Sequence, residues 1–342
     1  MATIQSIPRP TRQRPARPVR PARPALRLVD TRELARADWL QVRRSGIGSS
    51  DAAAAVGLSP YKSPLVLWLE KTGRDADLQR PDPLDTREPV YWGTLLEPIV
   101  AAAYTQQTGH RVRRLHAVLQ HPSVPFMLAN LDREVLGVPG VQVLECKTAG
   151  EFGARLWRAG VPEYVQLQVQ HQLAVTGRQA ADVAVLLCGQ QLEVHRIERD
   201  EALIAHLIEL EGRFWAYVQK DEPPPADGSA SAQAALRCLY PRSSGQTLDW
   251  RQDRAMSALF CDLQAVRGRL AEDSACEARI KQQIQQAMGQ ASRARFESGE
   301  VSWRRSQDSR GLDTQRLLAE QPDLLVRFPK TQPGRRRFVI HD

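Results

Sequence analysis

The sequence predicts an α/β fold, in which a mixed central sheet is flanked by helices, followed by a smaller, mostly helical C-terminal region with a β-hairpin. Three observations predict it. Segments with helix and strand periodicity alternate between residues 91 and 219. Residues 221–236, rich in proline, alanine and serine, then interrupt the pattern and are typical of a linker. Beyond them, residues 249–290 are strongly charged and have helical periodicity.

Length and composition exclude several classes of protein. The chain has 342 residues, enough for one large domain and a smaller one. It has no run of about 18 apolar residues, the length that a membrane-spanning helix needs, and its first residues lack the apolar core of a secretory signal. The five cysteines are widely spaced without a CxxC pair, which gives no support to a disulfide framework or a zinc site. We expect a protein of the reducing cytoplasm that does not enter a membrane.

The positive charge is concentrated at the N-terminus. The net charge is +8, but residues 1–29 contain seven arginines and no acidic residue, and the rest of the chain has 40 basic and 39 acidic residues. Because proline and arginine alternate there and large apolar residues are few, we expect residues 1–29 to form a disordered arm. Its arginines would either contact nucleic-acid phosphates or remain solvated, and composition does not separate these readings.

The predicted large domain covers residues 30–220 and begins with short helices. Ser49 or Ser50 is placed to cap a helix that follows directly. Ser63 before Pro64 predicts the start of a second helix, which a later glycine at position 73 ends.

Arg43 and Arg44 stand before a Gly-Ile-Gly-Ser-Ser turn that includes Ser50. Backbone N–H groups at the start of a helix, together with a guanidinium, can hold a phosphate. Ordinary helix capping beside a solvated arginine pair is the alternative, and composition alone favours it.

A longer helix is predicted over residues 91–109, closed by Gly109. The residues expected to form its buried stripe are Leu96, Ile99, Val100 and Ala103. Glu97 lies off this stripe between small neighbours. An isolated helix glutamate is exposed by default, so Glu97 belongs to a site only if this helix packs beside the acidic hairpin described below.

From residue 111 the pattern predicts a three-stranded meander, a helix, two strands and a last helix, all around one sheet. These segments are, in order, 111–121, 126–136, 141–148, 162–176, 181–188, 192–198 and 200–219. In the helix over 162–176, Tyr164, Gln168 and Gln172 share one face, and valines and a leucine form the core stripe.

The accessory region, residues 237–342, has less definite chemistry. We expect two antiparallel helices over 249–290, a hairpin that turns at Ser298–Gly299–Glu300, a helix near 313–327 and a basic terminal strand. Its arginines would contact DNA or form a solvated face, and the solvated face is the default.

The residues most suited to chemistry flank the turn at 137–140. If these four residues form the loop of a β-hairpin, counting outward places Asp132 directly opposite Glu145. The strand period of two puts Lys147 on the same face as Glu145 and turns Cys146 away. Two adjacent carboxylates repel, so one must bind a proton unless a cation lies between them. A surface salt bridge is the alternative, because an Asp…Glu-x-Lys spacing is common by chance.

A divalent metal would resolve the repulsion. Asp132 and Glu145, the backbone carbonyl of Cys146, and Glu97 directly or through water would offer oxygen ligands that suit Mg²⁺ or Mn²⁺. Lys147 would hold or activate the attacking water. Such a site suits phosphodiester hydrolysis.

The chain resembles the YqaJ-like viral recombinase family of phage-type nucleases, which is related to phage lambda exonuclease within the restriction-endonuclease-like superfamily. The motifs that carry the resemblance are RRSGIGSSDAAAAVGLSPYKSPLVLWLEKTG (43–73), GTLLEPIVAAAYTQQTG (93–109), HPSVPFMLANLDREV (121–135), VLECKTA (143–149) and VPEYVQLQVQHQLAVTG (161–177). The resemblance covers about residues 40–220. It implies a restriction-endonuclease-like core and Mg²⁺-dependent DNA cleavage.

The resemblance also implies roles for single residues. Its metal and catalytic positions correspond to Glu97, Asp132, Glu145, the Cys146 carbonyl, Lys147 and, on the following helix, Gln168. Arg44 and Ser50 correspond to the arginine and serine that hold the 5′-phosphate of the resected strand in the exonuclease branch, across a loop that is one residue shorter here.

The function favoured by the residues and the resemblance is a metal-dependent DNA nuclease of phage-type recombination, most simply an exonuclease that resects double-stranded ends in a bacterial host cytoplasm. Exonuclease members of the family work beside a single-strand annealing protein, and some form rings of three subunits. Such a protein and further copies of the chain are therefore the partners expected besides DNA. An endonuclease of the same fold and a non-catalytic DNA-binding protein are the alternatives.

Overall fold

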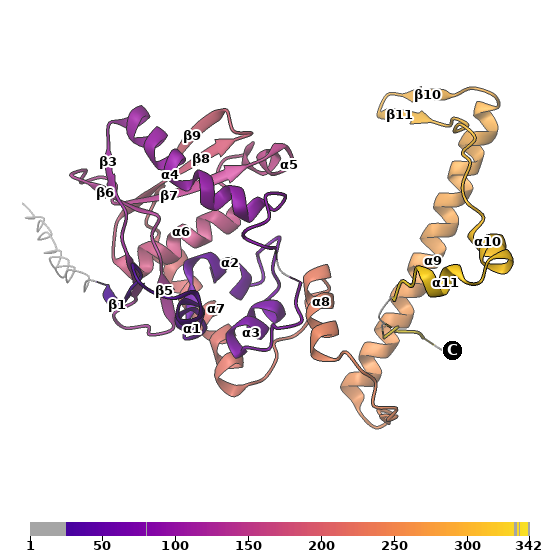
Figure 1. The fold of residues 1–342 in the computed structure, drawn as a ribbon, viewed down its shortest axis with the longest axis horizontal. Helices are drawn as coiled ribbons and strands as arrows, with labels where there is room; N and C mark the ends of the chain where they lie inside the picture. The colour runs from indigo at the N-terminus through magenta and orange to yellow at the C-terminus, as the bar shows by residue number, and fades with distance from the viewer. Residues whose placement is uncertain (1–24, 80, 332–333, 335, 341–342) are drawn as a thin grey trace, which may run out of the picture. The chain divides into compact units, whose positions relative to one another are not determined.

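The computed structural model describes residues 25–79, 81–331, 334 and 336–340, which divide into two units after Pro241 (Figure 1). The arm predicted over 1–29 lies, up to residue 24, outside the described residues. Its predicted end is wrong, because strand β1 (Leu26–Asp30) pairs with a later strand of the first unit.

A mixed five-stranded sheet carries the predicted site. Its strand order is β3-β6-β7-β8-β9, in which only β7 and β8 are parallel neighbours. The strands are β3 (Arg111–Arg113), β6 (Arg133–Leu136), β7 (Val143–Ala149), β8 (Ala180–Leu187) and β9 (Gln191–Glu198). The predicted mixed α/β architecture is confirmed, and the apolar run of β8 lies inside the sheet as a two-sided strand requires.

Helices α4 (Pro89–Thr108) and α6 (Glu163–Thr176) cover opposite faces of this sheet. Alternate strand residues point to opposite faces, and Val183 of β8 packs with the α6 cluster while Ala184 packs with the α4 cluster. The predicted stripe of α4 is wrong at Ile99, which is 55% exposed. The residues of α4 that are buried are Val100, Ala101 and Tyr104.

A second, four-stranded sheet divides the predicted meander. Its order is β1-β4-β5-β2, with strands β4 (Ala117–Gln120), β5 (Met127–Ala129) and β2 (Ile47–Gly48). The predicted strands 111–121 and 126–136 each break between the two sheets, so the expectation of one sheet is wrong. One break has a local cause, because the Asp132 side chain accepts the N–H of Cys146 that a strand carbonyl would otherwise accept.

Short helices precede α4: α1 (Arg36–Arg44), the 3-10 turn η1 (Ser49–Asp51), α2 (Ala52–Ala55) and α3 (Pro64–Thr72). Ser63 Oγ accepts the N–H of Val66 and caps α3 as predicted. Neither Ser49 nor Ser50 caps a helix through its side chain, because both lie within the 3-10 turn. All four alanines of α2 are buried, and α2 contacts α6.

Four further elements complete the first unit: α5 (Glu151–Ala154), η2 (Arg155–Trp157), α7 (Glu201–Lys220) and α8 (Ala230–Leu239). Helix α8 occupies part of the predicted linker 221–236, where Ala235 is buried in an apolar cluster with Leu65 and Trp68 of α3. Its small residues are typical of a linker by composition, yet they allow close packing. No helix in the described part of the chain is both long and apolar enough to cross a membrane.

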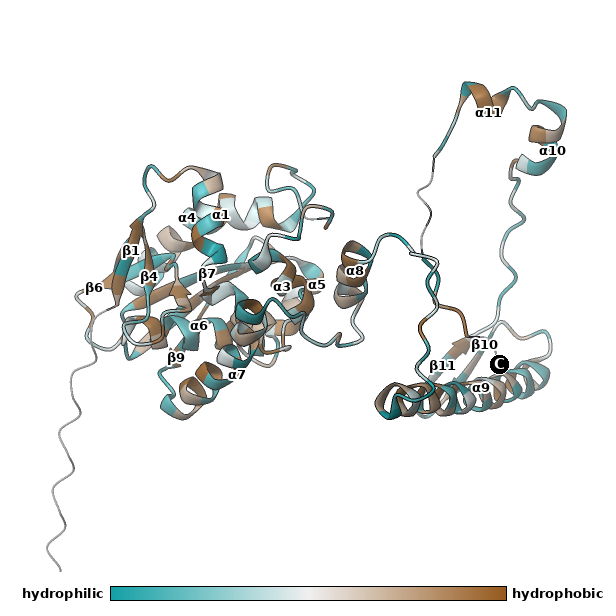
Figure 2. Ribbon diagram, turned by 90° about the horizontal axis from the view of Figure 1, so that it is seen from below, coloured by the Kyte–Doolittle hydropathy of each residue, from teal (hydrophilic) through white to brown (hydrophobic). Residues whose placement is uncertain are grey.

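The second unit is built on one helix, α9 (Arg254–Met288), of 35 residues (Figure 2). The prediction of two antiparallel helices is wrong. No proline interrupts the segment, and its single glycine, Gly268, costs about 1 kcal/mol, too little to break a long helix.

The remaining elements of the second unit confirm the hairpin but not its turn. Strands β10 (Arg293–Phe296) and β11 (Gly299–Ser302) pair Phe296 with Gly299, so the turn lies at 297–298. The helix predicted near 313–327 is two, α10 (Thr314–Glu320) and α11 (Leu324–Arg327), separated where Pro322 cannot continue a helix. Residues 336–340 form no strand, contrary to prediction.

Candidate active site

The β6–β7 hairpin brings the predicted acidic residues together. Arg133 pairs with Leu144, and the same register places Asp132 opposite Glu145, as counting from the turn predicts. Asp132 lies just before β6, and its Oδ2 accepts the backbone N–H of Cys146 at 2.8 Å. This bond holds the Asp132 carboxylate against the edge of β7.

Glu145 is a buried carboxylate with a full set of donors. Its side chain accepts hydrogen bonds from Gln168 Nε2 at 2.6 Å and Gln172 Nε2 at 2.7 Å, one to each oxygen. Lys147 Nζ lies 2.7 Å from the oxygen that Gln168 contacts. Because Glu145 is only 3% exposed, these donors replace the water that would otherwise solvate its charge.

Lys147 is held between Glu145 and Gln168. Its Nζ donates to Gln168 Oε1 at 2.8 Å as well as contacting Glu145. Burial alone would lower the pKa of Lys147, but the negative charges of Glu145 and Asp132 outweigh burial and raise that pKa. Lys147 is therefore a protonated donor at neutral pH.

Asp132 carries the charge that the site does not neutralise. Burial, and then the charge of Glu145, raise the pKa of Asp132 from the ordinary 3.8 to about 8. The Cys146 N–H and the Lys147 charge act in the opposite direction without offsetting this rise. The carboxyl of Asp132 consequently attracts either a proton or a metal cation.

Glu97 reaches this hairpin through an arginine. Its Oε1 accepts a hydrogen bond from Arg133 Nη1 at 2.5 Å, and the same nitrogen donates to the Asp132 carbonyl at 2.6 Å. The thiol of Cys146 packs in the α4 cluster, where burial raises its pKa. Because the N–H and C=O of one strand residue point the same way, the Cys146 carbonyl lies on the Asp132 side.

These groups fit a divalent cation in part. Two carboxylates and a backbone carbonyl are hard oxygen ligands of the kind that Mg²⁺ prefers. In the chain that the structure describes, however, no three His, Cys, Asp or Glu side chains are arranged to hold a metal ion. Glu97, the third carboxylate expected at the metal site, is instead paired with Arg133.

The Gly-Ser turn presents Arg43, rather than Arg44, to Ser50. Arg43 Nη2 donates to Ser50 Oγ at 3.4 Å and lies 3.0 Å from both oxygens of Asp51. Arg44 instead donates to Asp75 at 3.4 Å. Arg43 precedes Ser50 by seven positions, one more than Arg44, so counting from Arg43 removes the one-residue shortening of the loop. The assignment of Arg44 and Ser50 to a phosphate site stays a prediction.

A cavity of about 160 Å³ joins this turn to the acidic hairpin. Arg43, Ser49 and Ser50 line it from the turn, and Asp132 and Gln168 line it from the hairpin side. A water molecule occupies about 30 Å³ of liquid, so a phosphate group fits this space beside both the guanidinium and the carboxylate.

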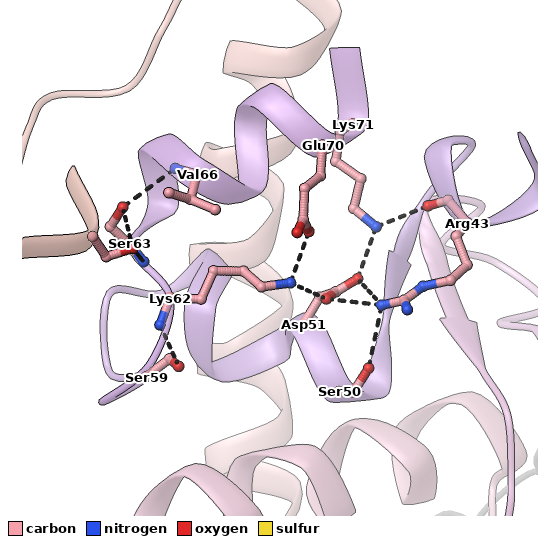
Figure 3. A network of polar contacts seen from close by, with 10 residues as sticks. Arg43, Ser50, Asp51, Ser59, Lys62, Ser63, Val66, Glu70 and Lys71 are labelled. Carbon is pink, nitrogen blue, oxygen red and sulfur yellow. Dashed lines mark hydrogen bonds and ion pairs between the residues drawn. The ribbon is translucent and has the colours of Figure 1, made fainter. Parts of the chain in front are cut away.

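Asp51 fixes the position of Arg43 (Figure 3). Its carboxylate is 1% exposed and also contacts Lys71 Nζ at 2.8 Å and Lys62 Nζ at 3.3 Å. Burial alone would raise the pKa of Asp51, but the three cations hold it well below its ordinary 3.8. Asp51 is therefore a permanent anion that anchors Arg43 at the cavity wall.

The sequence predictions singled out Arg44 rather than Arg43 of the arginine pair, gave Gln172 no role beyond the face it shares with Gln168, and gave Asp51 none. Gln172 lies one helical turn beyond Gln168, so its shared face could have identified it. Two adjacent arginines at the end of a helix give no such guide, and the partners of Asp51 lie up to 20 positions away in the sequence.

Residues 38–179 match the sequence model of the YqaJ-like viral recombinase domain. The uncharacterized protein YqaJ of Bacillus subtilis (strain 168) is 33% identical over 323 residues, which cover 92% of this chain and 97% of that protein. The chain belongs to the YqaJ-like viral recombinase family. This confirms the resemblance carried by the motifs between residues 43 and 177.

Two solved structures are similar to this YqaJ-family chain. The alkaline exonuclease LHK-Exo from Laribacter hongkongensis is 24% identical, with a TM-score of 0.44, over 54% of this chain and 93% of that chain. A phage-related exonuclease from Haemophilus somnus 129PT is 11% identical, with a TM-score of 0.35, over 54% of this chain and 99% of that chain. Likeness at these scores assigns no activity to this chain.

We expect Asp51→Asn to lower the free energy of unfolding by about 3 kcal/mol at neutral pH, because buried Lys71 loses its anion. The pKa of Asp51 is lower in the folded than in the unfolded protein, so its contribution is present above about pH 4 and is lost as the pH falls further. Urea unfolding should show the difference from wild type shrinking between pH 7 and pH 3. A difference that stays constant, or an equal loss in the partly exposed control Glu70→Gln, would contradict this.

Proposed function

We propose that the chain is a metal-dependent DNA nuclease of phage-type recombination, acting as an exonuclease that resects double-stranded ends. The observation that carries this proposal is the pair of half-buried Asp132 and buried Glu145, whose charge exceeds that of its cations, with Asp132 in one cavity with Arg43 and Ser50. A site that attracts a cation on one side and a phosphate on the other suits phosphodiester hydrolysis. Membership of the YqaJ-like viral recombinase family agrees with a role in recombination.

Mg²⁺ or Mn²⁺ would be held by Asp132, Glu145 and the Cys146 carbonyl, and Glu97 would join them on leaving Arg133. When bound, such an ion lowers the pKa of the attacking water and neutralises charge on the scissile phosphate. Gln168 and Gln172 would keep the Glu145 carboxylate in a fixed orientation. Because the Glu145 side chain is buried from water, its orientation depends on these two amide donors.

Lys147 would orient the attacking water and stabilise negative charge at the phosphate. Before an ion binds, the charges of Glu145 and Asp132 raise the pKa of Lys147, so its Nζ is a hydrogen-bond donor in that state. A bound cation would offset those two charges, so both roles expected from the sequence, holding and activating the water, remain part of the proposal.

Arg43 and Ser50 would hold the terminal phosphate of a DNA end. Asp132 lines the same cavity, so a phosphate held by Arg43 and Ser50 would lie near it, and the next phosphodiester along the strand would be the one cut. DNA duplex ends, a single-strand annealing protein and further copies of the chain are the proposed partners. The setting we propose is a bacterial host cytoplasm, with the protein encoded by a phage or prophage.

Asp132→Asn is expected to abolish hydrolysis of linear duplex DNA, because it removes the charge that attracts the cation. EDTA should do the same to the wild type, and added Mg²⁺ should restore it. The measurement is release of nucleotides from linear and from closed circular duplex. Nicking of the circle would indicate an endonuclease, and metal-independent DNA binding without any hydrolysis would indicate a non-catalytic DNA-binding protein.

Gln172→Ala should lower the hydrolysis rate by about 10- to 100-fold and raise the Mg²⁺ concentration needed for half-maximal rate, because one Glu145 oxygen loses its donor. A titration of initial rate against Mg²⁺ measures both. The matched control is Gln106→Ala on the exposed surface of α4, which should leave both quantities unchanged. Equal behaviour of the two variants would show that Gln172 does not orient Glu145.

Arg43→Ala should reduce the preference for 5′-phosphorylated over 5′-hydroxyl ends by at least tenfold, since a guanidinium–phosphate contact is lost. Arg44→Ala, which breaks the contact with Asp75 rather than one with Ser50, should preserve that preference. Paired rate measurements on the two kinds of end decide between them. Loss of preference in Arg44→Ala alone would restore the original assignment of the phosphate site.

A further inference from the structure

Helix α9 has an apolar stripe that the described residues of the second unit leave exposed. None of its residues is buried, and Leu259, Val266, Leu270 and Ile280 are between 41% and 61% exposed. Figure 2 shows hydrophobic positions alternating with hydrophilic ones along the helix. So long an exposed helix, with no buried residue of its own, needs another partner for its apolar face.

The stripe follows a seven-residue repeat. Its members are Met256, Leu259, Leu263, Val266, Leu270, Ile280, Ile284 and Ala287. The repeat has ten positions, separated alternately by three and by four residues. Asp273 and Glu277 occupy the two positions that are not apolar. A repeat of 3.5 residues over more than four heptads is typical of a coiled coil, in which a second helix of similar length covers the seam.

The two acidic positions select the direction of that second helix. In a parallel pair of identical helices, Asp273 would face Asp273 and Glu277 would face Glu277, and like charges at the seam repel. In an antiparallel pair, Leu270 faces Asp273 of the second copy, and Val266 faces Glu277 of the second copy. Those layers are flanked by Arg267 and Arg269.

The arginines that flank these layers supply complementary charge. Among the described residues, no ion pair joins Arg267 or Arg269 to an acidic side chain, whereas Glu277 has only the exposed Lys281 at 2.6 Å. In the antiparallel alignment, both arginines lie within one turn of Asp273 and Glu277 of the second copy. The same alignment places Leu263 against Ile280 and Leu259 against Ile284, so both ends of the seam are apolar.

We infer that α9 is a self-association surface on which two copies of the chain form an antiparallel coiled coil over residues 256–287. At 1.5 Å per residue this seam is about 48 Å long. A groove of about 490 Å³ at the N-terminal end of the helix, lined by Leu248, Trp250, Phe338 and the first stripe residues, is where the C-terminal turn of the second copy would sit. The inference does not depend on nuclease activity.

The assembly is tested first by mass. By light scattering, we expect the wild-type full chain to have the mass of a dimer, or of a larger assembly with an even number of 38.3 kDa chains. Leu263→Glu with Ile280→Glu should reduce that mass by at least twofold. Gln264→Glu with Gln282→Glu adds the same charge outside the seam and should leave the mass unchanged. A wild-type chain that is monomeric at micromolar concentration, or seam and control variants of equal mass, would overturn the inference.

Disulfide formation tests whether the two α9 helices run antiparallel. It does not use the glutamate variants, so a change in the fold of α9 in those variants does not affect its result. In a chain whose exposed cysteines 188, 261 and 276 are serine, Leu263→Cys and Ile280→Cys should each form little disulfide dimer alone on mild oxidation. Mixing the two variants should yield the cross-linked heterodimer. Efficient dimers of each single variant would instead show a parallel pair, and no cross-link in any sample would show that this seam is not formed.

Discussion

The burial of one carboxylate, Glu145, is the constraint around which the first unit is arranged. An ionised carboxylate inside a protein is tolerated only if hydrogen-bond donors replace its water. Two of those donors come from successive turns of α6 and one from its own strand, two residues on. The helix must therefore cross the sheet at one place and with one face inward, and its valines pack the core beneath the site as a result.

Asp132 shows how this arrangement also shapes the backbone. By accepting the Cys146 N–H, its side chain takes the place of a neighbouring strand at that point. The chain is then free to leave one sheet and join the other, which separates β5 from β6. The same carboxylate is left facing Glu145 with too little positive charge nearby, so the feature that ends a strand is also the one that attracts a proton or a cation.

The sequence predicted the parts of the site that depend on local counting. The opposition of Asp132 and Glu145 follows from the turn, and the face shared by Gln168 and Gln172 follows from the helical period. Contacts set by tertiary packing could not be obtained this way. Whether Arg43 or Arg44 faces Ser50 depends on how α1 ends, and the pairing of Glu97 with Arg133 depends on how α4 lies across β6. Along the chain, composition made α8 resemble a linker, and the charge of α9 concealed that it is one uninterrupted helix.

The four buried alanines of α2 have a consequence for substrate geometry. The turn with Ser49 and Ser50 contacts α6, the helix that holds Glu145, and α2 continues from that turn along the same helix. Methyl groups fill the space between α2 and its neighbours, so small side chains keep the turn close to α6. A larger side chain at these positions would push the turn away from α6 and change the distance between Ser50 and the Glu145 carboxylate.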